Sequence, residues 1–326
     1  MDLMYIDIGC SNQKHYLIRN GEVAEKEVVE TAEGNIYEII ARANSFQNKL
    51  VGEGYYINNA IVTSLSDSVV YELNNGDLFS LWYNDELPHY GGVTCNTISG
   101  KAVQKELHGM GNQLKYIQHK HRLDKVKRIL PISTFVSSYI AGNKDWNVWD
   151  YTHASNSGMF NMHTLNWDSC MLPFIAANCI NGVLYSPRHY IKRDIMDIHV
   201  GGHDTTFLYY GSPDGYITTG TWITAGKVQE KYKWERSNLP VRWILDANGR
   251  YHKQLCLHSS DPDKYIKLAE FLPPDKYNVS GAWRDSLITE LQHYLPSSVV
   301  LQPCNLLSTK SIYNYLRSKT SKQNRL

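Results

Sequence analysis

The sequence predicts a mixed α/β protein with two domains, and three observations support this fold class. The chain of 326 residues is long for one compact core and comfortable for two domains. The first half holds three strand-like runs, one amphipathic helix and further strands, which is the element order of a mixed α/β layer domain. An apolar run at residues 195–200 ends at Gly201-Gly202-His203-Asp204, which places a carboxylate on a glycine turn at a strand end.

Composition narrows the class of protein. Hydrophobic residues make up 42% of the chain, charged residues 20%, and the formal net charge is +1, an ordinary balance for a soluble globular protein. This balance gives no electrostatic reason to expect binding to nucleic acid or to an acidic membrane surface. The N-terminal run MDLMYIDIG lacks a basic segment and a long apolar stretch, so we expect neither a signal peptide nor a membrane anchor. The six cysteines form no CxxC pair, which predicts reduced thiols in the cytoplasm and no zinc or redox motif.

The first elements predict a β-hairpin with a polar tip. Strand-like runs at residues 3–8, 15–19 and 22–29 are interrupted by Gly9-Cys10-Ser11-Asn12 directly after Asp7 and Ile8. The tip offers backbone N–H groups, a hydroxyl and an amide, which are the donors that phosphate oxygens need, and a nearby carboxylate can hold Mg²⁺ through water. A plain Asx-type turn has the same composition, so the motif alone leaves both interpretations open.

The next elements continue the α/β pattern. A helix is predicted over 35–48, because Ile36, Ile39, Ile40 and Ala43 fall at helical spacing. Strands and turns then follow at 60–63, 64–67 (turn), 68–73, 74–77 (turn) and 79–83. Helices are predicted at 101–130 and 131–140, and the second half holds strand runs at 243–245 and 251–257 around a turn at Asn248-Gly249.

The turn at Gly201-Gly202-His203-Asp204 suits a general base held over a cleft, although most such turns are only turns. His199 lies four residues before His203, but the intervening glycines argue against a helix, so we predict no metal pair there. His119 and His121 sit on different faces of their predicted helix and also predict no metal site.

Five motifs in order resemble the FGGY carbohydrate kinases of the actin-like ATPase superfamily. The similar segments are the hairpin from Asp7 to Asn12, the run DYTHASNSGMFNMHTLNWD at residues 150–168, GGHD at 201–204, TGTW at 219–222, and a strand–glycine–helix–strand unit at 277–302. The motifs GGHD and TGTW are most similar to those of the rhamnulose and fuculose kinase branch. The resemblance implies two actin-like (ribonuclease H-like) α/β domains flanking a cleft, with the second domain reduced.

The resemblance also implies roles for individual residues. Asp204 would be the general base, Asp7 and Asp204 would hold Mg²⁺, and the acceptor would be a sugar or polyol that takes the γ-phosphoryl group of ATP. The residues expected to contact ATP are Gly9, Ser11, Asn12, Lys14, Gly220, Thr221 and Gly281. The residues expected to contact the acceptor are Asp67, Trp82, Asn84, Asp85 and His203. An alternative remains open for three of these residues. It is a core position for Trp82, a solvated loop for Asp85 and a structural turn for His203.

Departures from the family pattern keep two alternatives open. The chain is shorter than usual between Trp222 and Tyr277, and the adenosine motif has Ala282 after Gly281 where a second glycine is normal. We therefore place an N-terminal domain at 1–209 and a shortened nucleotide-binding domain at 210–326. A noncatalytic sugar- or nucleotide-binding protein, or a kinase with another phosphoryl donor, would also fit. We expect a monomer or homodimer without nucleic-acid or membrane partners.

Overall fold

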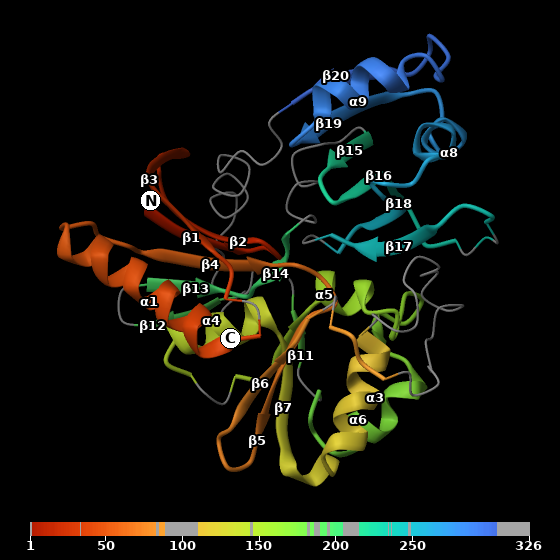
Figure 1. Ribbon diagram of the computed structural model, residues 1–326. Helices are drawn as coiled ribbons and strands as arrows, with labels where there is room; N and C mark the ends of the chain where they lie inside the picture. The colour runs from red at the N-terminus through yellow and green to blue at the C-terminus, as the bar shows by residue number, and fades with distance from the viewer. Residues whose placement is uncertain are drawn as a thin grey trace.

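Two β-sheets, each with its own helices, organise the molecule (Figure 1). The computed structural model describes residues 2–32, 34–82, 85–88, 110–143, 146–180, 183–185, 190–193, 196–204, 215–233, 235, 237–246 and 249–304. The predicted mixed α/β class is confirmed by these elements. The predicted boundary between 209 and 210 lies outside the described residues. No helix in the described part is long and apolar enough to cross a membrane.

The first sheet has the strand order β12-β13-β4-β1-β2-β3, with β14 also pairing with β4. Its strands are β1 (Asp2–Ile8), β2 (Asn12–Arg19), β3 (Glu22–Glu30), β4 (Asn59–Ser64), β12 (Tyr190–Arg193), β13 (Met196–His199) and β14 (Gly202–His203). The strand β1 is antiparallel to β2 and parallel to β4. At one end of the sheet, β3 exposes most of its side chains and buries none fully.

The helix α1 (Ile36–Gly52) links β3 to β4. Asn35 caps its N-terminus, because the Asn35 side chain accepts a hydrogen bond from the backbone N–H of Glu38. One apolar face of α1, which includes Ile39 and Phe46, is buried in the first hydrophobic core. The predicted helix at 35–48 is thus confirmed and extends to Gly52.

The second sheet has the order β17-β18-β16-β15-β19-β20. Its strands are β15 (Gly215–Thr219), β16 (Trp222–Gln229), β17 (Val241–Leu245), β18 (Tyr251–His258), β19 (Lys276–Gly281) and β20 (Val300–Pro303), and its helices are α8 (Lys264–Phe271) and α9 (Arg284–Leu291). The strand β15 is antiparallel to β16 and parallel to β19, which repeats the β1, β2 and β4 arrangement of the first sheet. The predicted strand–glycine–helix–strand unit is confirmed as β19, Gly281, α9 and β20.

A smaller sheet, β6-β5-β7, and several short elements complete the first half. These elements are β5 (Val69–Leu73), β6 (Leu78–Leu81), α3 (Met110–Lys120), η1 (Leu123–Lys125), β7 (Val126–Pro131), α4 (Ile132–Ile140), β8 (Val148–Asp150), α5 (Tyr151–Asn156), β9 (Phe160–Asn161), β10 (Asn166–Trp167), η2 (Ser169–Met171), α6 (Leu172–Ala176) and β11 (Val183–Tyr185). Both β5 and β6 follow the predicted strand, turn and strand pattern.

One predicted helix is partly wrong. The prediction covered 101–130, but α3 ends at Lys120 and residues 126–131 form β7, which pairs along the length of β5. Apolar residues such as Ile129 and Leu130 fit either a helix or a buried strand, and here the pairing with β5 decides the outcome. Residues 101–109 lie outside the described residues. The prediction also missed α8, whose segment lacks a clear apolar period.

Candidate active site

A cavity of about 610 Å³ lies between the two sheets and is lined by residues of both. From the first sheet, the turn between β1 and β2 contributes Gly9 to Asn12, and the segment after β14 contributes Asp204. From the second sheet, the turn between β15 and β16 contributes Gly220 and Thr221. Residues that are far apart in the sequence therefore line the same cavity.

The first hairpin carries a pair of opposite charges beneath its turn. Asp7 on β1 lies directly opposite Lys14 on β2, and the Lys14 Nζ atom donates to Asp7 Oδ2 at 3.2 Å. Thr63 on β4 donates to the other oxygen, Asp7 Oδ1, at 3.2 Å. Burial opposes the charge of Lys14, but the attraction of Asp7 outweighs it and the pKa of Lys14 lies above its usual value. The pair therefore favours the charged form of Lys14 at the cavity wall.

The turn of the first hairpin is closed by its own backbone. Gly9 N–H donates to the Asn12 carbonyl at 3.0 Å, and a Cβ atom at Gly9 would lie 3.1 Å from that carbonyl oxygen. Ser11 and Asn12 are exposed at the tip, and both line the cavity. The donors that the sequence predicted for phosphate oxygens thus face the cavity.

The second hairpin is uncharged at the matching positions. Thr218 on β15 lies opposite Thr224 on β16, and both line the cavity. The indole Nε1–H of Trp283 donates to the Gly220 carbonyl at 3.3 Å, so the segment after β19 braces this turn. Gly220 has open space around its α-carbon, because a Cβ there would meet nothing closer than 3.8 Å.

Gly281 is required by packing as well as by conformation. Its φ of +112° lies in the region that side chains disfavour, and a Cβ would lie 2.0 Å from the Thr219 carbonyl oxygen. The next residue, Ala282, donates its N–H to the same Thr219 carbonyl at 3.1 Å. The sequence linked this glycine to adenosine, whereas the contact with Thr219 already accounts for it.

A close backbone approach sets the position of Asp204. A Cβ at Gly201 would lie 2.8 Å from both the Val62 carbonyl oxygen and the Ser133 Cβ, so only glycine allows β14 to lie against β4 here. The Asp204 side chain is 30% exposed, and its Oδ1 lies 3.2 Å from Nε2 of His203. This is the close approach that the two glycines predicted.

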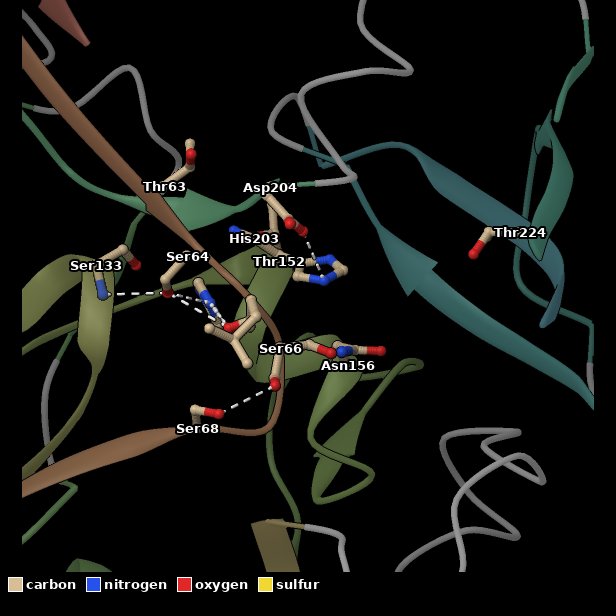
Figure 2. A network of polar contacts seen from close by, with 12 residues as sticks. Thr63, Ser64, Ser66, Ser68, Ser133, Thr152, Asn156, His203, Asp204 and Thr224 are labelled. Atoms are coloured by element: carbon tan, nitrogen blue, oxygen red, sulfur yellow. Dashed lines mark hydrogen bonds and ion pairs between the residues drawn. The ribbon is translucent and has the colours of Figure 1, made fainter. Parts of the chain in front are cut away.

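Asp150 organises a buried network that runs through Thr152 to His203, the residue before Asp204 (Figure 2 labels the last three). Its Oδ1 accepts from the backbone N–H of His153 at 2.9 Å, which caps α5, and also from the Thr152 hydroxyl. The Thr152 Oγ1 atom in turn accepts from the backbone N–H of His203 at 2.7 Å. One carboxylate therefore fixes the backbone next to Asp204, which explains why an Asp and a Thr stand at this spacing.

The same carboxylate also reaches the end of β4 through His153. Nδ1 of His153 lies 2.7 Å from Asp150 Oδ2, while its Nε2 lies 3.3 Å from Ser64 Oγ and 3.4 Å from the Leu65 carbonyl. Burial alone would lower the pKa of His153, but the Asp150 carboxylate outweighs burial and holds that pKa above 6.5. An imidazolium suits this position, because each ring nitrogen faces an oxygen acceptor. Sequence reasoning missed His153, since Ser64 lies 89 residues away.

Arg242 on β17 was also missed. Only 5% of its surface is exposed, and it lines the cavity. Its Nε donates to Gln254 Oε1 and its Nη1 to Asn156 Oδ1, each at 2.6 Å. A buried arginine on a cavity wall gives no sequence pattern, because both partners lie in other elements.

Three predicted acceptor residues, Asp67, Trp82 and Asp85, are not brought to this cavity. Trp82 is 1% exposed within the first hydrophobic core, and its backbone N–H donates to Asp85 Oδ2 at 2.8 Å. Asp67 is 1% exposed and lies in a left-handed turn with a φ of +54°. These three residues do not line the cavity, whereas His203 does. Asn84 lies outside the described residues. Among the described side chains, no group of three or more His, Cys, Asp or Glu residues has metal-binding geometry.

No family model and no curated protein matches the sequence. Solved structures do match. A xylulose kinase from Lactobacillus acidophilus has a TM-score of 0.73 at 11% identity, with 98% of this chain and 90% of that chain covered. A gluconate kinase from the same organism has a TM-score of 0.71 at 11% identity, covering 98% and 91%. A Plasmodium falciparum glycerol kinase with ADP has a TM-score of 0.63 at 14% identity, covering 83% and 66%.

At these identities the matches show the fold. The chain shares the two-domain α/β fold of these carbohydrate kinases, and the predicted fold class is confirmed. None of the three matches described above is a rhamnulose or fuculose kinase, so that branch stays a prediction.

Proposed function

We propose that this protein is an ATP-dependent kinase that transfers the γ-phosphoryl group to a hydroxyl of a small sugar or polyol. One observation carries the proposal: Asp204 and two hairpin turns from separate sheets line the same cavity. Phosphoryl transfer needs little covalent chemistry from the protein, which positions the reactants and stabilises charge. The Asp204 carboxylate and the backbone N–H groups of the two turns would together position the reactants and stabilise charge.

Asp204 is proposed as the general base. It is partly exposed to the cavity and held on one side by the His203 ring and on the other by the rigid backbone of β14. A carboxylate in this position can accept the proton of an acceptor hydroxyl as its oxygen attacks the γ-phosphorus. His203 would orient Asp204 and contact the acceptor.

The two turns are proposed to bind the phosphates. Ser11 and Asn12 on the first hairpin and Thr221 on the second offer hydroxyl, amide and backbone donors, and Lys14 adds positive charge beneath the first turn. Gly9 and Gly220 allow the backbone of each turn to approach a phosphate closely. Gly281 and Ala282 also line the cavity and would lie toward the adenosine end.

The chain's carboxylates fit a magnesium ion that travels with the nucleotide. Mg²⁺ in phosphoryl-transfer sites is usually held by one or two carboxylates together with waters and substrate phosphates. Asp7 and Asp204 line the same cavity and supply that number of carboxylates. When bound, the ion would neutralise charge on the phosphates. The predicted acceptor contacts at Asp67, Trp82 and Asp85 are not part of the proposal, because these residues lie away from the cavity wall.

The test is coupled ADP release with MgATP over a panel of sugars, polyols and sugar acids. We expect acceptor-dependent turnover that falls by about 10²- to 10⁴-fold in Asp204→Asn. Asp124→Asn, an exposed carboxylate paired with Arg122, is the matched control and should keep wild-type turnover. Turnover that survives in Asp204→Asn would remove this residue as the base.

Two other results would replace the proposal. Protection of the fold by ATP without ADP release on any acceptor would indicate a noncatalytic binding protein. Turnover with another phosphoryl donor and none with ATP would indicate that Ala282 and Trp283 shape the cavity for a different donor.

A further inference from the structure

The cavity wall holds one positive charge that the proposed chemistry does not use. Lys14 is paired with Asp7, and Asp204 lies beside His203. Arg242, in contrast, donates to the neutral side-chain amides of Gln254 and Asn156, its hydrogen-bond partners among the described residues. Among the residues that the structure describes, no carboxylate lies within ion-pair distance of its guanidinium.

Burial makes this arrangement informative. Arg242 is 95% buried, since 5% of its surface is exposed, and a guanidinium removed from water without a counter-charge is costly. Two short hydrogen bonds hold Nε and Nη1 in place and leave three of the five N–H donors, two of them on Nη2. A fixed cation with a spare donor on a cavity wall is suited to an anionic oxygen group.

The position of Arg242 separates it from the nucleotide turn. Arg242 pairs with Gln254, Gln254 with Gly226, and Gly226 with Tyr216, so three strand spacings separate it from β15. At about 4.8 Å per spacing, its backbone is roughly 14 Å across the sheet from the strand that carries Gly220. The phosphate-binding turn is therefore not the natural partner of this charge.

The hydrogen bond to Asn156 directs Arg242 toward the acceptor end instead. Asn156 follows Thr152 by four residues on α5, so the two side chains lie one turn apart on the same face. Thr152 accepts from the backbone N–H of His203, which precedes Asp204. Figure 2 shows Asn156, Thr152, His203 and Asp204 gathered at this end of the site. The Arg242 guanidinium thus lies near the segment that would meet the acceptor.

We propose that Arg242 binds an anionic group of the acceptor, so that the substrate is a sugar carrying a carboxylate or phosphate rather than a neutral sugar. This rests on the proposed kinase function for the identity of the acceptor. The charge would select such an acceptor by pairing with its anion, while neutral sugars would leave the guanidinium without a partner.

The experiment compares acceptors that differ only in the anion. Aldonates, the matching alditols and alditol phosphates of five and six carbons are titrated by calorimetry, without nucleotide, into the wild type, Arg242→Gln and Lys253→Gln. The last variant removes a partly exposed charge, paired with Glu235, from β18 and does not alter a residue that lines the cavity. We expect the wild type to prefer an anionic acceptor over its neutral match by at least about 10-fold, as for a charged hydrogen bond.

In Arg242→Gln this preference should fall by about 10- to 100-fold, with neutral binding changed less than about 3-fold, while Lys253→Gln keeps the preference. A preference confined to aldonates identifies a carboxylate, and one confined to alditol phosphates identifies a phosphate; both support the proposal. Equal loss for charged and neutral acceptors in Arg242→Gln would overturn it, because Arg242 would then only join β17 to α5.

If Arg242→Gln fails to fold, binding measurements on the wild type alone still test the proposal. Thermal stabilisation by neutral alditols but not by their anionic matches would overturn the proposal. Sugar-acid binding without ADP release would leave the acceptor inference standing and contradict the kinase function, so the two failures remain distinguishable.

Discussion

The two hairpins at the cavity share a backbone plan and differ in chemistry. In each, an antiparallel pair ends in a glycine-containing turn, and the first strand lies parallel to a later strand of its sheet. At matching positions below the turns, the first hairpin has Asp7 opposite Lys14 and the second has Thr218 opposite Thr224. One framework thus holds an ion pair in one sheet and two neutral hydroxyls in the other.

This difference shows that one backbone arrangement can carry charged side chains in one sheet and neutral hydrogen-bond donors in the other. Charged side chains, which can bind Mg²⁺ or phosphate oxygens, belong to the sheet that also carries Asp204. The second hairpin offers neutral donors that fix position without adding charge. Moving the charge of one hairpin to the other, or removing it, should therefore have unequal effects.

Among changes to the two hairpins, the largest effect is expected from removing the carboxylate of the first. Asp7→Asn should lower kcat/KM with MgATP by about 10²- to 10³-fold, because the loss removes a fixed charge from the reacting phosphates. Thr218→Val, the matched change in the second hairpin, should cost less than about 10-fold, as for a neutral hydrogen bond. Steady-state kinetics over a range of Mg²⁺ concentrations provide the measurement. Equal losses in both variants would show that the charge difference has no catalytic meaning.

A smaller effect, on stability, should separate the two glycines of the second hairpin region. Gly281→Ala forces a side chain into a φ of +112° and against the Thr219 carbonyl, so the free energy of unfolding should fall by about 2–4 kcal/mol. Gly220→Ala meets open space and should cost less than about 1 kcal/mol. Urea denaturation followed by circular dichroism checks both. A stable Gly281→Ala would mean that β15 and β19 separate without cost.

The smallest effects concern pH and two buried carboxylate–histidine pairs, one in each half. Because the pKa of His153 is raised above 6.5 by Asp150, its contribution to stability is complete below pH 6.5 and is lost as pH rises through the folded-state pKa. Burial would raise the pKa of Asp246, but hydrogen bonding from His252 lowers it below 3.8. Its contribution is therefore present above pH 3.8 and is lost as pH falls through the folded-state value.

Thermal melts across pH should resolve these opposite signs. His153→Asn should reduce the decline of Tm above pH 6.5, and Asp246→Asn should reduce the decline of Tm at acidic pH, each by on the order of a few degrees. The same pH profile in both variants as in the wild type would show that neither pair titrates with unfolding.

Local patterns made much of this fold predictable. The second hairpin was expected only from the family resemblance. Helical spacing, in contrast, predicted α1, the polar turn at residues 9–12 predicted the first hairpin, and the turn at residues 201–204 predicted where Asp204 stands. Each of these depends on neighbours in the sequence, whose geometry follows from backbone sterics and apolar spacing. The strand β7 was missed because its apolar residues fit either structure until β5 pairs with them.

The site was less predictable, because its buried polar contacts join distant segments. Arg242 meets Asn156 across 86 residues, and no spacing rule connects them. Trp82 has an aromatic side chain of the kind that stacks on sugars, yet it is packed in the hydrophobic core. An aromatic side chain has the same chemistry in both settings, so only the packing distinguishes them.

The outer strand β3 has a consequence for how copies of the protein meet one another. An edge strand can template pairing between molecules, and β3 carries Glu22, Glu25, Glu27 and Glu30 with one opposing charge at Lys26. Two such edges brought together at neutral pH repel, which disfavours growth of the sheet from one molecule into the next.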